Sequence, residues 1–179
     1  MQMVNDSQHE NNFFANLYLN RGYKTAVELA FKHGNLNGWS VLDYGCGTKR
    51  LLTFLPKYCT YVGYDKNPEY SDVENINGFH ADAVFCLSTL CFLTKEELVC
   101  FSKEIASKKP VFLVVSVPCE YFTNKLLRFL FAKDFANEVF HNSHWIDVGK
   151  ALLKDFELVE VKRVCLMQWV TVWKPRSVK

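Results

Sequence analysis

Short apolar runs alternate with longer stretches of helical periodicity along most of the chain. The apolar runs predict strands at 40–44, 60–64, 83–87, 111–117, 158–165 and 167–173. The helical stretches are 13–19, 24–32, 49–55, 94–107, 126–140 and 143–156, with Ser143 as the N-cap of the last. Strands alternating with helices, followed by two consecutive strands, predict an α/β fold of three layers. Its sheet should be mostly parallel with an antiparallel C-terminal strand.

The middle of this pattern is unusually short. Residues 66–82, between the second and third predicted strands, are too few for a helix and a complete extra strand. We therefore expect this middle region of the fold to be abbreviated. The sequence has no repeat and no linker, which predicts one domain over residues 1–179, with an N-terminal helical segment at 1–37 and two halves, 38–118 and 119–179.

Charge, hydropathy and cysteine content limit the partners and the compartment that the sequence favours. The net charge is +2 and the 21 Lys and Arg residues are scattered, which argues against a nucleic acid partner. No apolar stretch approaches 18 residues, so we expect no membrane span. Seven cysteines without a C-x-x-C pair predict neither a disulfide framework nor a metal site. These features indicate a reduced, cytoplasmic protein, and they leave its oligomeric state open.

A glycine-containing turn follows the first predicted strand. The strand ends at Asp43 and Tyr44 and leads into Gly45, Cys46 and Gly47. The glycines permit a tight turn and let a ligand approach the backbone closely. Dinucleotide-binding turns carry a third glycine, but Arg50 stands in its place, so a nicotinamide-dependent reductase is a weak alternative.

Two acids mark the ends of neighbouring strands. Asp65 ends the second predicted strand, where a carboxylate can accept hydrogen bonds from ribose hydroxyls. Asp43 ends the first strand and would repel a pyrophosphate. An acid at that position suits a cofactor with a cationic sulfonium and an ammonium group.

Together these segments resemble the class I S-adenosylmethionine-dependent methyltransferases. Residues 41–47 (VLDYGCG) are similar to the first motif of that family and 61–65 (YVGYD) to the second. Weaker likenesses at 81–90, 111–118 and 156–161 extend the resemblance over about 38–175. The resemblance implies a three-layer, Rossmann-like methyltransferase fold whose third-strand region is abbreviated here. In this fold residues 38–118 would bind S-adenosylmethionine and residues 119–179 would form the acceptor side.

The resemblance also implies which residues bind the cofactor. Gly45 and Gly47 would contact its methionine part, Asp43 its amino group and Asp65 its ribose. The remaining cofactor-binding candidates are Tyr44, Cys46, Lys66, Asn67, Leu87 and Ser88. For the adenine, Asp72, His80 and Asp82 are candidates, and the shortened segment predicts an open adenine pocket.

The predicted activity is methyl transfer to a small-molecule, sugar or lipid-like acceptor. Direct displacement needs mainly alignment of the reactants, and His144 is a candidate general base because its reference pKa lies near neutrality. A helix-capping or surface role for His144 is an equal alternative. A catalytically degenerate accessory module with the same fold is the alternative to an enzyme.

Overall fold

A computed structural model of the 179-residue chain describes residues 13–118, 143–164 and 168–176. Its helices are α1 (Phe13–His33), α2 (Lys95–Ser107) and α4 (Trp145–Leu152), with 3-10 turns η2 (Arg50–Thr53) and η3 (Leu90–Phe92). Its strands are β1 (Ser40–Tyr44), β2 (Thr60–Tyr64), β3 (Ala83–Leu87), β4 (Phe112–Pro118), β5 (Phe156–Val164) and β6 (Gln168–Pro175). The helix predicted at 126–140 lies outside the described residues.

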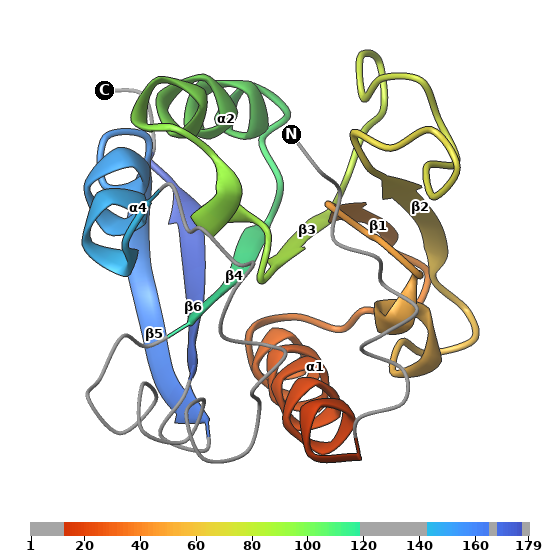
Figure 1. The fold of residues 1–179 in the computed structure, drawn as a ribbon. Helices are drawn as coiled ribbons and strands as arrows, with labels where there is room; N and C mark the ends of the chain where they lie inside the picture. Colours follow the sequence, from red (N-terminus) through yellow and green to blue (C-terminus); the bar gives the residue numbers. More distant parts are fainter. Residues whose placement is uncertain (1–12, 119–142, 165–167, 177–179) are drawn as a thin grey trace.

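One sheet with the order β2-β1-β3-β4-β6-β5 forms the centre of the molecule (Figure 1). The first four strands are parallel to one another, and β6 runs antiparallel to both β4 and β5. All of β3 and nearly all of β4 is buried, as expected for parallel strands with helices on both faces. The predicted α/β fold class is thereby confirmed.

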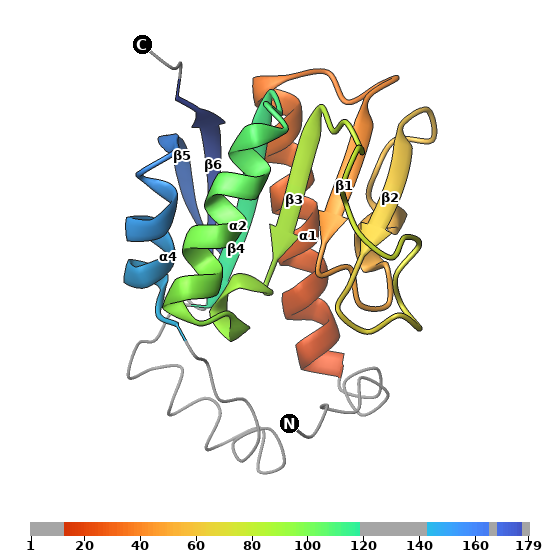
Figure 2. The same ribbon diagram turned by 90° about the horizontal axis from the view of Figure 1, so that it is seen from above.

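The helices form a layer on each side of the sheet (Figure 2). Helix α1 covers one face, where Ala26 and Ala30 pack in one core with Phe85 and Phe112. Helices α2 and α4 cover the other face, where a second core forms around Phe101. The two layers bury the sheet and leave the carboxyl ends of its parallel strands at one edge, where ligands bind in open α/β sheets.

Three local predictions were wrong. The two N-terminal helices are one helix, α1, which continues through Gly22. The helix predicted at 49–55 is the short turn η2, because Lys49 takes a left-handed conformation with φ of 59°. The N-cap of α4 is His144, since the Ser143 hydroxyl is buried and donates instead to the Leu93 carbonyl (2.7 Å).

The shortened segment 66–82 contains no helix or strand, as expected. Strand β2 therefore lies at the edge of the sheet, and Asp72 covers part of that edge. The Asp72 amide donates to the Gly63 carbonyl (2.8 Å), and its carboxylate accepts from the Gly63 amide (2.9 Å). One aspartate thus satisfies at Gly63 the two backbone groups that a further strand would otherwise pair.

No helix among the described residues is long and apolar enough to cross a membrane.

Candidate functional site

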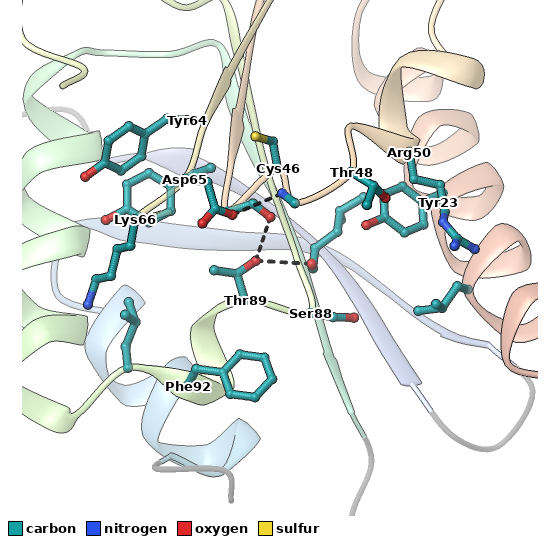
Figure 3. A pocket seen from close by; sticks show the side chains of 16 residues that line it. Tyr23, Cys46, Thr48, Arg50, Tyr64, Asp65, Lys66, Ser88, Thr89 and Phe92 are labelled. Carbon is teal, nitrogen blue, oxygen red and sulfur yellow. Dashed lines mark hydrogen bonds between the residues drawn. The ribbon is translucent and has the colours of Figure 1, made fainter. Parts of the chain in front are cut away.

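A cavity of about 340 Å³ opens at the carboxyl ends of β1, β2 and β3 (Figure 3). Its walls come from the turn after β1, the ends of β2 and β3, the turn η3 and one face of α1. The lining residues are Leu19, Tyr23, Tyr44, Gly45, Cys46, Gly47, Thr48, Arg50, Tyr64, Asp65, Lys66, Leu87, Ser88, Thr89, Phe92 and Leu93. This volume falls in the range of small-molecule sites.

Gly45 begins the turn in a conformation that favours glycine, with φ of 78°. Its amide donates to the Tyr64 carbonyl (2.7 Å), and its carbonyl accepts from the Thr89 hydroxyl (3.2 Å). A Cβ atom here would lie 2.2 Å from Thr89 Cγ2. The residue therefore has to be glycine for the turn to pass between the ends of β2 and β3.

Asp65 joins the end of β2 to the glycine turn. Its Oδ2 accepts a hydrogen bond from the Gly47 amide (3.0 Å), and its Oδ1 accepts one from the Asn67 amide (2.9 Å). A carboxylate offers about four acceptor positions, so two remain for a ligand in the cavity. The geometry is therefore compatible with the predicted ribose contact while giving Asp65 a second task, which is to fix the turn.

Asp43 lies beneath the turn rather than on the cavity wall. Its side chain is 2% exposed, and its Oδ2 accepts from the Tyr61 hydroxyl (2.9 Å). Burial raises the pKa of the Asp43 carboxyl to about 7, the Tyr61 hydrogen bond opposes that rise, and the charge of Asp65 adds to it. In this arrangement Asp43 would act on an ammonium or sulfonium group through its charge and not by direct contact.

Leu87 and Ser88, two of the cofactor-binding candidates, line the cavity at the end of β3. Ser88 has φ of 60°, which is uncommon outside glycine and marks local strain. Its amide donates to Ser116 (2.9 Å to Oγ), and its hydroxyl accepts from Gln168 Nε2 (3.1 Å). The buried Gln168 also donates to Ser116 Oγ (2.6 Å), so three strands hold the strained residue in place.

Three further candidates, Tyr44, Cys46 and Lys66, line the cavity, whereas Asn67 does not. Lys66 forms an ion pair with Glu97 on α2 (2.8 Å). Burial, with the charges of Asp43 and Asp65, raises the pKa of the Cys46 thiol to about 12, which disfavours the nucleophilic thiolate form.

His144 is exposed and lies at the start of α4, where its amide donates to Asp147 Oδ2 (3.3 Å). It is not among the residues that line the cavity. The structure therefore does not bring the candidate base together with the predicted cofactor-binding residues.

The candidates for the adenine contact lie outside the cavity. Asp82 accepts from the Ser40 amide (2.8 Å) at the amino end of β1, and His80 lies 3.5 Å from Asp82. Both residues are thus at the opposite edge of the sheet. Asp72 covers Gly63 and forms an ion pair with Lys49, so its carboxylate is already engaged.

Several wall residues were not predicted from the sequence. Leu19 and Tyr23 come from α1, Arg50 from η2, and Phe92 and Leu93 from the turn after β3. The spacing of Leu19 and Tyr23 places them on one helix face, but only tertiary packing brings that face to the cavity. Among the described residues, no group of His, Cys, Asp or Glu could hold a metal ion.

Comparison with known proteins finds likeness in structure alone. No protein-family model and no curated protein matches the chain. An S-adenosylmethionine-dependent methyltransferase from Clostridium acetobutylicum matches with a TM-score of 0.70 at 13% identity, over 96% of this chain and 98% of that one.

Two further matching structures are named for different methyl acceptors. Magnesium protoporphyrin IX methyltransferase from Synechocystis, with bound S-adenosylhomocysteine, has a TM-score of 0.62 at 16% identity, over 98% of this chain and 90% of its own. A small RNA methyltransferase has a TM-score of 0.60 at 18% identity, over 87% of this chain and 25% of its own. At such identities the matches establish a shared fold and assign no acceptor.

Proposed function

We propose that this chain, which has the fold of the class I S-adenosylmethionine-dependent methyltransferases, transfers a methyl group from that cofactor to a small-molecule, sugar or lipid-like acceptor. The observation that carries the proposal is the cavity in which Gly45, Gly47, Asp65 and Ser88 meet at the ends of three parallel strands. In this proposal residues 1–179 form one domain that acts in the cytoplasm.

The cavity fits this cofactor in size and in chemistry. A volume of about 340 Å³ is of the order expected for a nucleoside with an amino-acid tail. Asp65 keeps acceptor positions for ribose hydroxyls, and its carboxylate suits a cation better than a pyrophosphate.

When bound, S-adenosylmethionine supplies an electrophilic methyl group on a positively charged sulfur. Asp65 would hold the ribose, and the turn at Gly45–Gly47 would let the methionine part lie against the backbone. Ser88 and Leu87, which line the cavity at the end of β3, would lie near the methyl group. The contribution of these residues is alignment of the donor and the acceptor, which alone can lower a barrier by about 7–11 kcal/mol in favourable cases.

The walls around Ser88 support an acceptor with apolar or aromatic surface. Tyr23 lies on one side of this region and Phe92 on the other (Figure 3), and Leu19 and Leu93 also line the cavity. The described lining contains no histidine. A role for His144 as a general base stays a prediction.

The proposal is tested with S-adenosylmethionine labelled in its methyl group. The protein is incubated with this cofactor and with small-molecule extracts separated into polar, sugar and lipid fractions. We expect label to enter a fraction with equal release of S-adenosylhomocysteine, and the variant Asp65→Ala to lose the transfer. Exposed Glu74→Ala is the matched control, because Glu74 does not line the cavity.

A degenerate, non-catalytic module is the second candidate. It is favoured by the structural tasks that Asp43 and Asp65 perform within the turn. The same assay separates the enzyme from the non-catalytic module. Binding of the cofactor without transfer of label to any fraction would contradict the proposed methyl transfer. Absence of binding at millimolar S-adenosylmethionine would contradict the cofactor itself.

A further inference from the structure

Arg50 places a positive charge in the cavity wall, on the side that faces α1 (Figure 3). Its Nη1 donates to Asn16 Oδ1 (2.8 Å) and to Asn20 Oδ1 (3.3 Å). Both partners are neutral amides. No carboxylate among the described residues lies within ion-pair distance of this guanidinium group.

The cations nearest to Arg50 along the wall and the chain differ in this respect. Lys66 is paired with Glu97 (2.8 Å). Lys49, which precedes Arg50 in the chain, is paired with Asp72. Arg50 is therefore the lining cation that lacks an acidic partner within the described part of the chain.

The two asparagines hold the guanidinium group without neutralising it. Asn16 and Asn20 are one helical turn apart, so both face the same side of α1, as do Leu19 and Tyr23 of the cavity wall. Both of their hydrogen bonds use Nη1 of Arg50. The guanidinium group has five N–H donors in a planar fork, so an edge with Nη2 remains to bind a carboxylate through two parallel hydrogen bonds.

The position of Arg50 relative to Asp65 determines which part of a bound cofactor would reach Arg50. Asp65 and Lys66 lie at one end of the cavity, and Thr48 and Arg50 lie at the other, with the glycine turn between them (Figure 3). A cofactor whose ribose lies at Asp65 and whose methionine part crosses the turn would bring its α-carboxylate to the side of Arg50.

We propose that Arg50, held by Asn16 and Asn20, binds the α-carboxylate of the methionine part of S-adenosylmethionine. This inference rests on the proposed function, because it takes that cofactor as the ligand. It makes Arg50 a residue that selects the amino-acid end of the cofactor, at the sequence position where a dinucleotide-binding turn would have glycine.

The test compares S-adenosylmethionine with decarboxylated S-adenosylmethionine, which lacks only this carboxylate. Their dissociation constants are measured by calorimetry for the wild type and for Arg50→Gln. We expect the wild type to prefer the carboxylated ligand by about tenfold or more, as charged hydrogen bonds typically give. In Arg50→Gln the preference should fall to about twofold or less, with the affinity for the decarboxylated ligand nearly unchanged.

A second variant separates a carboxylate-binding role from a structural one. Asn16→Asp is close in shape to the native residue and keeps an acceptor for Arg50 Nη1, but it gives Arg50 an internal carboxylate partner. The contact between η2 and α1 should therefore persist while the preference for the carboxylated ligand falls by about tenfold. Arg21→Gln, on an exposed position of α1 outside the cavity, should leave the preference unchanged.

Three outcomes would overturn the inference. The first is a wild type that binds both ligands equally, and the second is an Arg50→Gln variant that weakens both by the same factor. The third is an unchanged preference in Arg50→Gln together with a raised KM for the acceptor, which would assign Arg50 to an acidic acceptor. A wild type that binds neither ligand would instead contradict the proposed function.

Discussion

The carboxyl group of Asp43 combines deep burial with a position directly under the glycine turn. With 2% of its surface exposed, it is neutral over a wider pH range than an ordinary aspartate, because burial raises its pKa to about 7. The Tyr61 hydroxyl supplies its hydrogen bond (2.9 Å). The charge of Asp43 therefore changes near neutral pH, although this residue does not line the cavity.

Replacement Asp43→Asn should change how stability depends on pH. The folded wild type retains a proton on Asp43 that the unfolded chain releases above its pKa of about 3.8, so the free energy of unfolding falls as pH rises from about 4 to about 7. The slope is at most about 1.4 kcal/mol per pH unit. Asp43→Asn removes this term. Urea denaturation is measured from pH 4.5 to 8.5. The free energy of unfolding of the variant should rise relative to that of the wild type up to about pH 7, and the difference should stay constant above that pH.

Exposed Glu157→Gln is the control for this series, and its difference from the wild type should lack such a rise. A stability difference between Asp43→Asn and the wild type that stays constant with pH would contradict the raised pKa.

Two glycines with opposite surroundings give a second prediction at this scale. A Cβ atom on Gly22 would lie 2.3 Å from Oε1 of the buried Gln168, whose amide nitrogen is already bound to Ser88 and Ser116. Gly22→Ala should therefore lower the free energy of unfolding by about 1–3 kcal/mol. Gly149→Ala in α4 meets nothing within 4 Å and should raise it by about 0.5–1 kcal/mol. Urea midpoints measure the two changes in stability. Equal effects of Gly22→Ala and Gly149→Ala would contradict the close packing of Gly22 against Gln168.

At the scale of elements, the strands were the easiest part to predict from the sequence. The runs Thr60–Tyr64 and Ala83–Leu87 both have the predicted bounds. Ala83–Leu87 is a buried parallel strand, and such a strand needs a continuous apolar run between polar or glycine-rich ends. The turn η2 was not predictable in this way. Its left-handed start at Lys49 accompanies an ion pair with Asp72, and no local pattern reveals a contact between residues so far apart.

The edge of β2 provides the test at this scale. Asp72→Ala removes the carboxylate that accepts from the Gly63 amide and that pairs with Lys49. Hydrogen exchange at the Gly63 amide should become faster by about tenfold, while exchange in β3 and β4 stays as in the wild type. Glu74→Ala, on an exposed neighbour, is the control. Unchanged protection of Gly63 in Asp72→Ala would show that Asp72 does not stabilise this edge.

In the molecule as a whole, the sheet brings together groups that are distant in the chain. The sequence predicted the strand ends that carry Gly45, Asp65 and Ser88, because each follows an apolar run. It did not reveal that α1 packs beside them, since a helix surface does not identify its partner. Tyr23 and the asparagines that hold Arg50 were therefore found only in the folded chain.

The central claim is that the ends of β1, β2 and β3 form a site for S-adenosylmethionine. Calorimetric titration of the wild type and of Asp65→Ala with this cofactor tests it most directly. We predict saturable binding to the wild type and at least about a tenfold loss in Asp65→Ala, since the ribose would lose its charged hydrogen bonds. No heat of binding at millimolar cofactor, or equal affinity of the two proteins, would contradict the account.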